Sequence, residues 1–175
     1  MKWNRNMVLV ATSMVIGLIS GILRPRFLAE HAYADLIASL QHFSAAFDDQ
    51  SIGISAFFAA ILRYGRPLLL IWACATLPKA RFAALLVLYL RAMALGFSAT
   101  MMVRAFGGSG FAAALALYGL QNLIIMPIYA CTAYFIIQKH GGFDLKLGGI
   151  GLVAVIAASM TEAYVSPMLL AMIWR

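Results

Sequence analysis

Five long apolar runs constrain this chain more than any other feature. One hydrophilic segment separates the first two runs, and short charged or glycine-rich breaks separate the others. A bilayer core about 30 Å thick needs a helix of about 20 apolar residues. Runs of about this length occupy residues 7–23, 56–77, 82–103, 111–138 and 147–170. Hydrophobic residues make up 64% of the chain and charged residues 11%, whereas soluble domains carry about 45–50% and about 25%. We therefore expect an all-α, polytopic membrane bundle of five transmembrane helices that forms one domain over residues 1–175.

Basic residues between the runs predict how the chain crosses the membrane, because lysine and arginine are enriched in cytoplasmic loops. With a cytoplasmic N-terminus, the inner segments carry Lys2, Arg5, Lys79, Arg81, Lys139 and Lys146, and the outer segments carry Arg24, Arg26, Arg104 and Arg175. The first run resembles a signal peptide, but the small-residue motif at residues 32–34 lies too far beyond it, which indicates an uncleaved anchor. We expect a multi-pass protein of the cell (inner) membrane, with its N-terminus cytoplasmic and its C-terminus outside.

The formal charge of +7 is spread between the apolar runs rather than clustered. Nucleic-acid binding needs a concentrated basic surface, so this distribution argues against it. The partner that the composition does predict is the lipid bilayer.

Residues 24–55, the first outer loop, form the only sizeable hydrophilic segment of the sequence. Four of its apolar side chains recur at helical spacing with polar residues between them: Leu36, Leu40, Phe43 and Phe47. This spacing predicts an amphipathic helix on the outer membrane face. Such a helix would serve equally well as a lid on the bundle or as a docking surface for a partner.

Polar side chains inside the apolar runs are informative, because each is expensive in hydrocarbon unless it has a partner. At a helical rise of about 1.5 Å per residue, Arg91 lies roughly 14 Å from the inner end of its run, and Gln121 and Asn122 lie roughly 15–17 Å from the outer end of theirs. We therefore expect the Arg91 guanidinium to bond the side-chain oxygen of one of these amides at the membrane midplane. Backbone carbonyls near Pro127, which we expect to kink its helix, are the other candidate acceptors.

A second polar set is expected nearer the outer surface. Arg63, Arg66 and Glu162 all lie roughly 10–15 Å below the outer face of their runs. We expect Glu162 to pair with one of the two arginines between the second and fifth spans. The simpler interpretation of both polar sets is that they hold the bundle together, and the alternative is a functional site.

Small residues recur at four-residue spacing in two of the runs. They are Gly17 and Gly21 in the first run, and Ala92, Gly96 and Thr100 in the third. This spacing favours close helix contact within the bundle first and a homo-oligomer second.

No pattern in the sequence predicts catalysis, a cofactor or a metal site. GGSG at residues 107–110 matches the G-x-S-G of rhomboid-type intramembrane serine proteases, which need a base beside the serine. The histidines are His31, His42 and His140, and all lie in loops. His31 and Asp35 have i, i+4 spacing, but two ligands do not make a metal site. We expect a chain that is not an enzyme.

Two stretches carry short motifs in an order that is typical of one family. The first is LYLRAMALGFSATMMVRAFGGSGFAAALALYGLQNLIIMPIYA, residues 88–130, and the second is TEAYVSP, residues 161–167. They resemble the stage II sporulation protein M family, in which a membrane Arg-Gly, a Gly-Phe and a Gly-rich turn precede Pro-Gln-Asn and Pro. The residues that fall on this pattern are Arg91, Gly96, Phe97, Gln121, Asn122, Pro127, Glu162 and Pro167. Ala92 and Leu120 depart from it, since the family usually has Gly and Pro there.

The resemblance implies a spore-forming bacterium and a non-catalytic role in engulfment. Family members lie in the mother-cell septal membrane, where they anchor a peptidoglycan-degrading complex with stage II sporulation proteins D and P, which supply the enzymes. The loop at residues 24–55 would then meet these partners. The alternative is a small transporter or channel component whose midplane polar site takes a solute or a lipid headgroup. A water-filled cavity at that site would favour transport, and a dry, fully paired site would favour the scaffold.

Overall fold

The computed structural model describes residues 4–45, 53–76, 82–138 and 145–173, and in these ranges the regular structure is entirely helical. The all-α prediction is confirmed. The α-helices are α1 (Arg5–Leu23), α2 (Glu30–Ala45), α3 (Ile54–Thr76), α4 (Ala83–Ala114), α5 (Leu120–Gln138), α6 (Leu145–Met160) and α7 (Ser166–Ile173). Three short helical segments join them: η1 (Arg24–Phe27), and the π-helical η3 (Leu115–Gly119) and η4 (Thr161–Val165).

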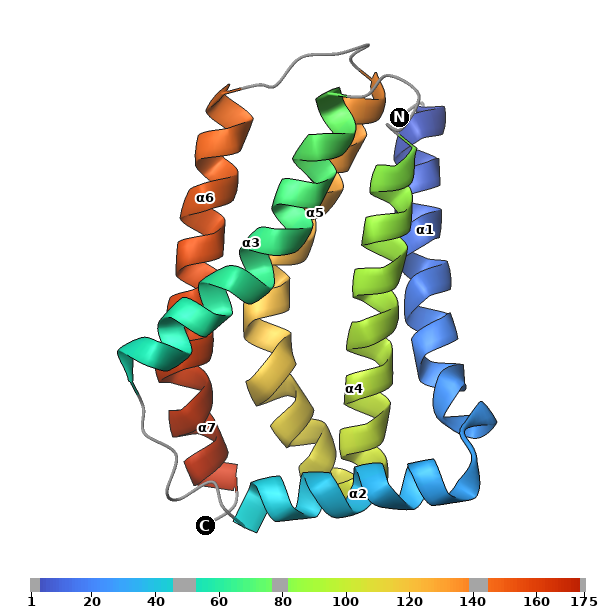
Figure 1. Cartoon of the computed structure of the whole chain (residues 1–175), viewed down its shortest axis with the longest axis vertical. Coiled ribbons are helices and arrows are strands. Elements are labelled where there is room, and N and C mark those ends of the chain that lie inside the picture. The colour runs from blue at the N-terminus through green and yellow to red at the C-terminus, as the bar shows by residue number, and fades with distance from the viewer. Residues whose placement is uncertain (1–3, 46–52, 77–81, 139–144, 174–175) are drawn as a thin grey trace.

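Among the described residues, four helical stretches are long and apolar enough to cross a membrane: Arg5–Phe27, Ile54–Thr76, Ala83–Gln138 and Leu145–Ile173. They are compatible with a membrane protein. The expected third and fourth runs fall within one of these stretches, because only Gly107, with φ of 62° and ψ of −131°, departs from helical geometry between them. Figure 1 shows α4 running to the end of the bundle where α2 lies, and α5 returning toward the other end. Glycine suits this reversal because it has no Cβ to clash at positive φ.

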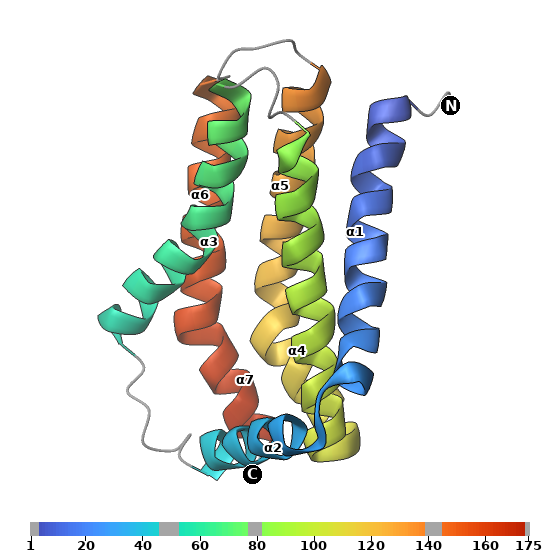
Figure 2. The ribbon, with the colours of Figure 1, turned by 45° about the vertical axis from the view of Figure 1, so that its right-hand side comes forward.

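Glycines bring α1 and α4 into direct contact, and Figures 1 and 2 show the two helices side by side. A Cβ at Gly17 would collide with the backbone carbonyl of Tyr89, and one at Gly96 would lie 2.5 Å from the carbonyl oxygen of Leu18. Close packing of this kind is a main source of helix association in lipid. Close helix contact within the bundle is confirmed, while the homo-oligomer stays a prediction.

The main core lies between α3, α4, α5 and α6, and includes the fully buried Leu68, Leu88 and Tyr129. A second, smaller core contains Met102 and Leu170. The outer surface of the long helices carries many large apolar side chains, among them Leu62, Leu123 and Val153. Such a surface suits contact with lipid tails rather than water.

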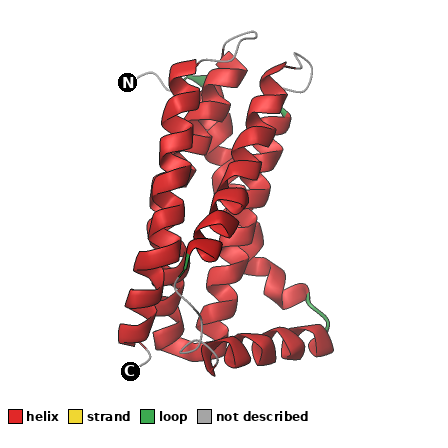
Figure 3. Cartoon of the chain, turned by 60° about the vertical axis from the view of Figure 1, so that its left-hand side comes forward, coloured by secondary structure: helices red, strands yellow, loops and turns green. Residues whose placement is uncertain are grey.

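Helix α2 lies crosswise over one end of the bundle (Figures 1 and 3). Its Leu40 packs against the second core, and the Arg104 guanidinium of α4 lies 5.6 Å from the ring centroid of Tyr33. Leu36, in contrast, is 36% exposed. Phe47 and the side chain of Phe43 lie outside the described residues. The structure therefore ties α2 to the bundle and leaves part of its apolar surface open.

Candidate functional site

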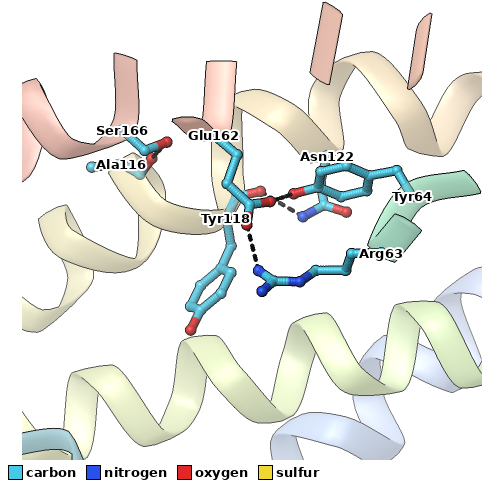
Figure 4. A network of polar contacts seen from close by, with 7 residues as sticks. All are labelled: Arg63, Tyr64, Ala116, Tyr118, Asn122, Glu162 and Ser166. Atoms are coloured by element: carbon cyan, nitrogen blue, oxygen red, sulfur yellow. Dashed lines mark hydrogen bonds and ion pairs between the residues drawn. The ribbon is translucent and has the colours of Figure 1, made fainter. Parts of the chain in front are cut away.

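Tyr64 is the centre of a polar network that joins α3, η4 and α5, and Figure 4 shows its contact with Glu162. Its side chain, from α3, is 2% exposed. The Tyr64 hydroxyl donates a hydrogen bond to Oε2 of Glu162 in η4, and Oε1 of the same carboxylate pairs with Nη1 of Arg63. The predicted ion pair of Glu162 with one of two arginines is thus formed by Arg63. Arg66 is exposed and makes no ion pair among the described residues.

Tyr129 of α5 also contacts Tyr64, since its hydroxyl donates a hydrogen bond to the backbone carbonyl of Tyr64 at 2.5 Å. Helix α3 contains Pro67, which has no N–H and leaves the carbonyl four residues earlier without its usual donor. Figure 2 shows that α3 changes direction along its length, as helices commonly do near proline. The carbonyl that Pro67 leaves free is that of Arg63, and the Tyr129 hydroxyl bonds the next carbonyl along the chain, that of Tyr64.

The two π-helical segments bring side-chain donors to backbone carbonyls. In η3, the Tyr118 carbonyl accepts a hydrogen bond from Nδ2 of Asn122 at 2.6 Å, and the Ala116 carbonyl accepts one from the Ser166 hydroxyl at 2.7 Å (Figure 4). Backbone polar groups in a bilayer must find partners within the protein. Wide turns of this kind are common at functional sites, and here η4 carries Glu162 itself.

The predicted bond between Arg91 and the amide pair is wrong. The Arg91 guanidinium instead lies over the ring of Tyr64, with 5.1 Å from its central carbon to the ring centroid. Its Nε is buried without a hydrogen-bond partner, and so are both amide atoms of Gln121 and Oδ1 of Asn122. Neither amide side chain therefore offers its oxygen to Arg91. A cation over an aromatic face is a favourable contact that becomes stronger away from water.

Three residues from the two expected sets, Arg91, Asn122 and Arg63, line one cavity of about 160 Å³. Arg63 and Tyr64 come from α3, and Arg91 comes from α4. The remaining lining residues are Ala94, Leu95, Ser98, Tyr118 and Asn122. Gln121 is fully buried but does not line this cavity. Pro127 lines a different, apolar groove of about 440 Å³ between α1, α4 and α5.

The charges around this cavity do not cancel. Two guanidinium groups, Arg63 and Arg91, line it, and the carboxylate bonded to its described lining residues is that of Glu162, whose two oxygens accept from Arg63 and Tyr64. The Arg63 side chain is 57% exposed and that of Glu162 is 18% exposed. The arrangement can hold helices together and can attract an anion. The described residues that line the cavity include Ser98 but no histidine and no cysteine.

GGSG, which the sequence places in a glycine-rich break between two apolar runs, lies within α4 and is helical except at Gly107, where the chain reverses. The bond that Ser109 makes is local, since its hydroxyl donates to the Phe106 carbonyl at 2.8 Å within one turn. In the part of the chain that the structure describes, no three His, Cys, Asp or Glu side chains gather where they could hold a metal ion.

Sequence reasoning missed the tyrosines Tyr64, Tyr118 and Tyr129, because aromatic residues in apolar runs read as ordinary core or interface residues. A buried tyrosine hydroxyl needs a hydrogen-bond partner, so a tyrosine beside Arg63 in a membrane run was the available signal. Ser166 was missed for the same reason, as a small residue in an apolar run. The sequence gives no signal for the π-helical turns.

Comparisons with known proteins do not match the chain to a family model, to a curated protein or to a solved structure. The likeness to the stage II sporulation protein M family therefore depends on the short motifs alone. Function has to be argued from the site and from the placement of those motif residues.

Proposed function

We propose that this chain is a non-catalytic membrane scaffold of the stage II sporulation protein M type, which anchors and localises a peptidoglycan-degrading complex during spore engulfment. One observation carries the proposal: motif residues from distant segments come together. Arg91 and Asn122 line one cavity, and Glu162 bonds Tyr64, over which Arg91 lies. Residues of separate motifs that converge on one centre support the idea that the motifs form a unit. The chain would lie in the mother-cell septal membrane.

The scaffold would cross the membrane five times, with its N-terminus in the cytoplasm and its C-terminus outside. The reversal at Gly107 supports two crossings within the stretch Ala83–Gln138. The start of α1 and the end of α7 lie at opposite ends of the bundle (Figure 1), as an odd number of crossings requires. Helix α2 would then lie on the outer membrane face as an amphipathic helix.

We place the docking surface for stage II sporulation proteins D and P on α2. Leu40 and Tyr33 hold this helix on the bundle, while Leu36 stays partly exposed. Leu36 lies on the same face of α2 as Leu40 and Tyr33, so this face is only partly covered by the bundle, and a face of this kind supports both interpretations that the spacing left open. The helix covers the bundle as a lid and presents apolar surface to a partner.

Co-purification from sporulating cells tests this role. The tagged full chain is isolated in mild detergent, and the recovered proteins are identified by mass spectrometry. We expect stage II sporulation proteins D and P to be recovered with the wild-type chain. Leu36→Glu should reduce their recovery, because it places a charge in the exposed apolar surface.

Ala38→Glu is the matched control, since it adds the same charge to an exposed position on the same helix. It lies about 200° around the helix from Leu36, at about 100° per residue. Recovery should be unchanged in this variant. Absence of cell-wall hydrolases from the wild-type sample, or equal recovery with Leu36→Glu, would contradict the scaffold.

The cavity favours one second candidate, a small transporter or channel component. Buried polar atoms of Arg91 and Asn122 without protein partners are unusual in a purely structural network. A site that moves a solute or a lipid headgroup would leave such atoms free for its ligand. Uptake or lipid-scrambling assays with the reconstituted protein would separate this role from the scaffold.

A further inference from the structure

We propose that the cavity between α3, α4 and η3 binds a phosphate-type oxyanion, with Arg91 and Arg63 as its cationic ligands. The anion would be either a free phosphate or the headgroup of an anionic lipid. This inference goes beyond the scaffold role and uses the same cavity as the second candidate. It concerns binding alone, so it can fail without affecting the recovery of hydrolases.

The cavity carries an unbalanced positive charge. Glu162 is the only carboxylate in contact with the described cavity residues, and both of its oxygens are already bonded. Within the described ranges Arg91 makes no ion pair, and its guanidinium lies over the face of Tyr64. In surroundings of low dielectric constant, an unbalanced guanidinium attracts an anion strongly. The planar fork of arginine also matches phosphate oxygens in a bidentate way.

Two residues that line the cavity have buried polar atoms without hydrogen-bond partners. Nε of Arg91 is a buried donor without an acceptor, and Oδ1 of Asn122 is a buried acceptor without a donor. Asn122 is only 9% exposed, and its amide orientation is set by the bond from Nδ2 to the Tyr118 carbonyl. A phosphate carrying one proton offers acceptor oxygens to Arg91 and one O–H to Asn122. An anion without a donor would leave the asparagine unsatisfied.

The cavity is large enough for an anion and is open to the surroundings. A water molecule needs roughly 10–15 Å³, so a cavity of about 160 Å³ has room for a larger group. Tyr64 and Asn122 form the buried inner wall, whereas Arg63 and Ala94 are exposed and stand at the entrance. Because Arg63 and Ala94 lie well inside α3 and α4 rather than at their ends, a headgroup can approach from the bilayer as well as from solution.

Binding is measured on the purified full chain by two arms. In the first, inorganic phosphate is titrated into detergent-solubilised protein and followed by calorimetry. In the second, nanodiscs containing phosphatidic acid or only phosphatidylcholine are compared by native mass spectrometry of retained lipid. Saturable binding in either arm supports the site, and the arm that responds identifies the source of the anion.

Arg91→Gln should weaken binding at least tenfold, because it removes the unbalanced charge. Arg66→Gln is the matched control, since it removes the same charge from an exposed arginine that does not line the cavity, and its affinity should equal that of wild type. Ser98→Asp adds a carboxylate to the cavity wall without removing a lining arginine, and should give a comparable loss if Arg91→Gln does not fold. No binding in either arm, or wild-type affinity in Ser98→Asp, would overturn the proposal.

Discussion

At the scale of single residues, Tyr64 links the charged side chains of the site to one another. Tyr64 donates to Glu162, accepts at its backbone from Tyr129, and lies beneath Arg91. Contacts from α4, α5 and η4 thus converge on one α3 residue. A charged group in lipid is tolerated only where neighbours compensate it, and Tyr64 supplies that compensation on two sides.

Removing the tyrosine hydroxyl tests this network. Tyr64→Phe keeps the ring beneath Arg91 but deletes the donor to a carboxylate, and we expect the unfolding free energy to fall by about 1.5–3 kcal/mol. Glu162→Gln should cost about 1–2 kcal/mol, less than a fully buried pair, because Arg63 is 57% exposed. Unfolding in mixed detergent micelles measures both.

A double-mutant cycle supplies the decisive comparison. Since the two side chains share one hydrogen bond, the combined variant should show a coupling of about 0.5–3 kcal/mol relative to the sum of the single changes. Arg66→Gln should stay within about 0.5 kcal/mol of wild type, because this arginine makes no ion pair in the described structure. Additive effects of the two variants would show that Tyr64 and Glu162 act independently.

At the scale of helical elements, irregular turns position the site. The π-helical segments η3 and η4 are joined by the bond from Ser166, which follows η4, to the Ala116 carbonyl within η3. Each of the two π-helical segments contains a polar residue of the site: Tyr118 lies in η3 and Glu162 lies in η4. Regular helices at these places would turn those side chains to other faces.

The reversal between α4 and α5 depends on one glycine, which makes it testable. Gly107 has a φ of 62°, and a Cβ there would meet nothing within 4 Å, so the cost of a side chain would come from the backbone alone. Gly107→Ala should lower the unfolding free energy by about 1–3 kcal/mol. Gly108→Ala also enters open space but without positive φ, and should be neutral or slightly stabilising, as alanine generally is in a helix. Equal effects of the two variants would mean that the turn does not require glycine.

At the scale of the whole molecule, the sequence predicted the helical runs better than the contacts that side chains make within them. Apolar length and charge spacing were enough to predict the helical runs and a pairing of Glu162 with Arg63 or Arg66, of which the structure forms the one with Arg63. The partner of Arg91 was predicted wrongly, because its guanidinium lies over the ring of Tyr64, although Asn122 lines the same cavity. The amide of Asn122 donates instead to the Tyr118 carbonyl in the π-helical turn η3. Hydropathy carries no signal for such a turn.

The number of crossings decides how this molecule faces its surroundings, and it can be measured directly. Five crossings place the two termini on opposite sides of the membrane, whereas four would place them on the same side. We expect a C-terminal alkaline phosphatase fusion to be active, because that enzyme folds only outside the cytoplasm.

Cysteine labelling tests the side on which α2 lies. In a background without Cys74 and Cys131, Ser39→Cys on the exposed side of α2 should react with a membrane-impermeant maleimide in intact cells, and Asn4→Cys should react only after lysis. Protection of Ser39→Cys together with an inactive fusion would place α2 in the cytoplasm. Such a result would remove the docking surface from the side where peptidoglycan lies, and the scaffold role with it.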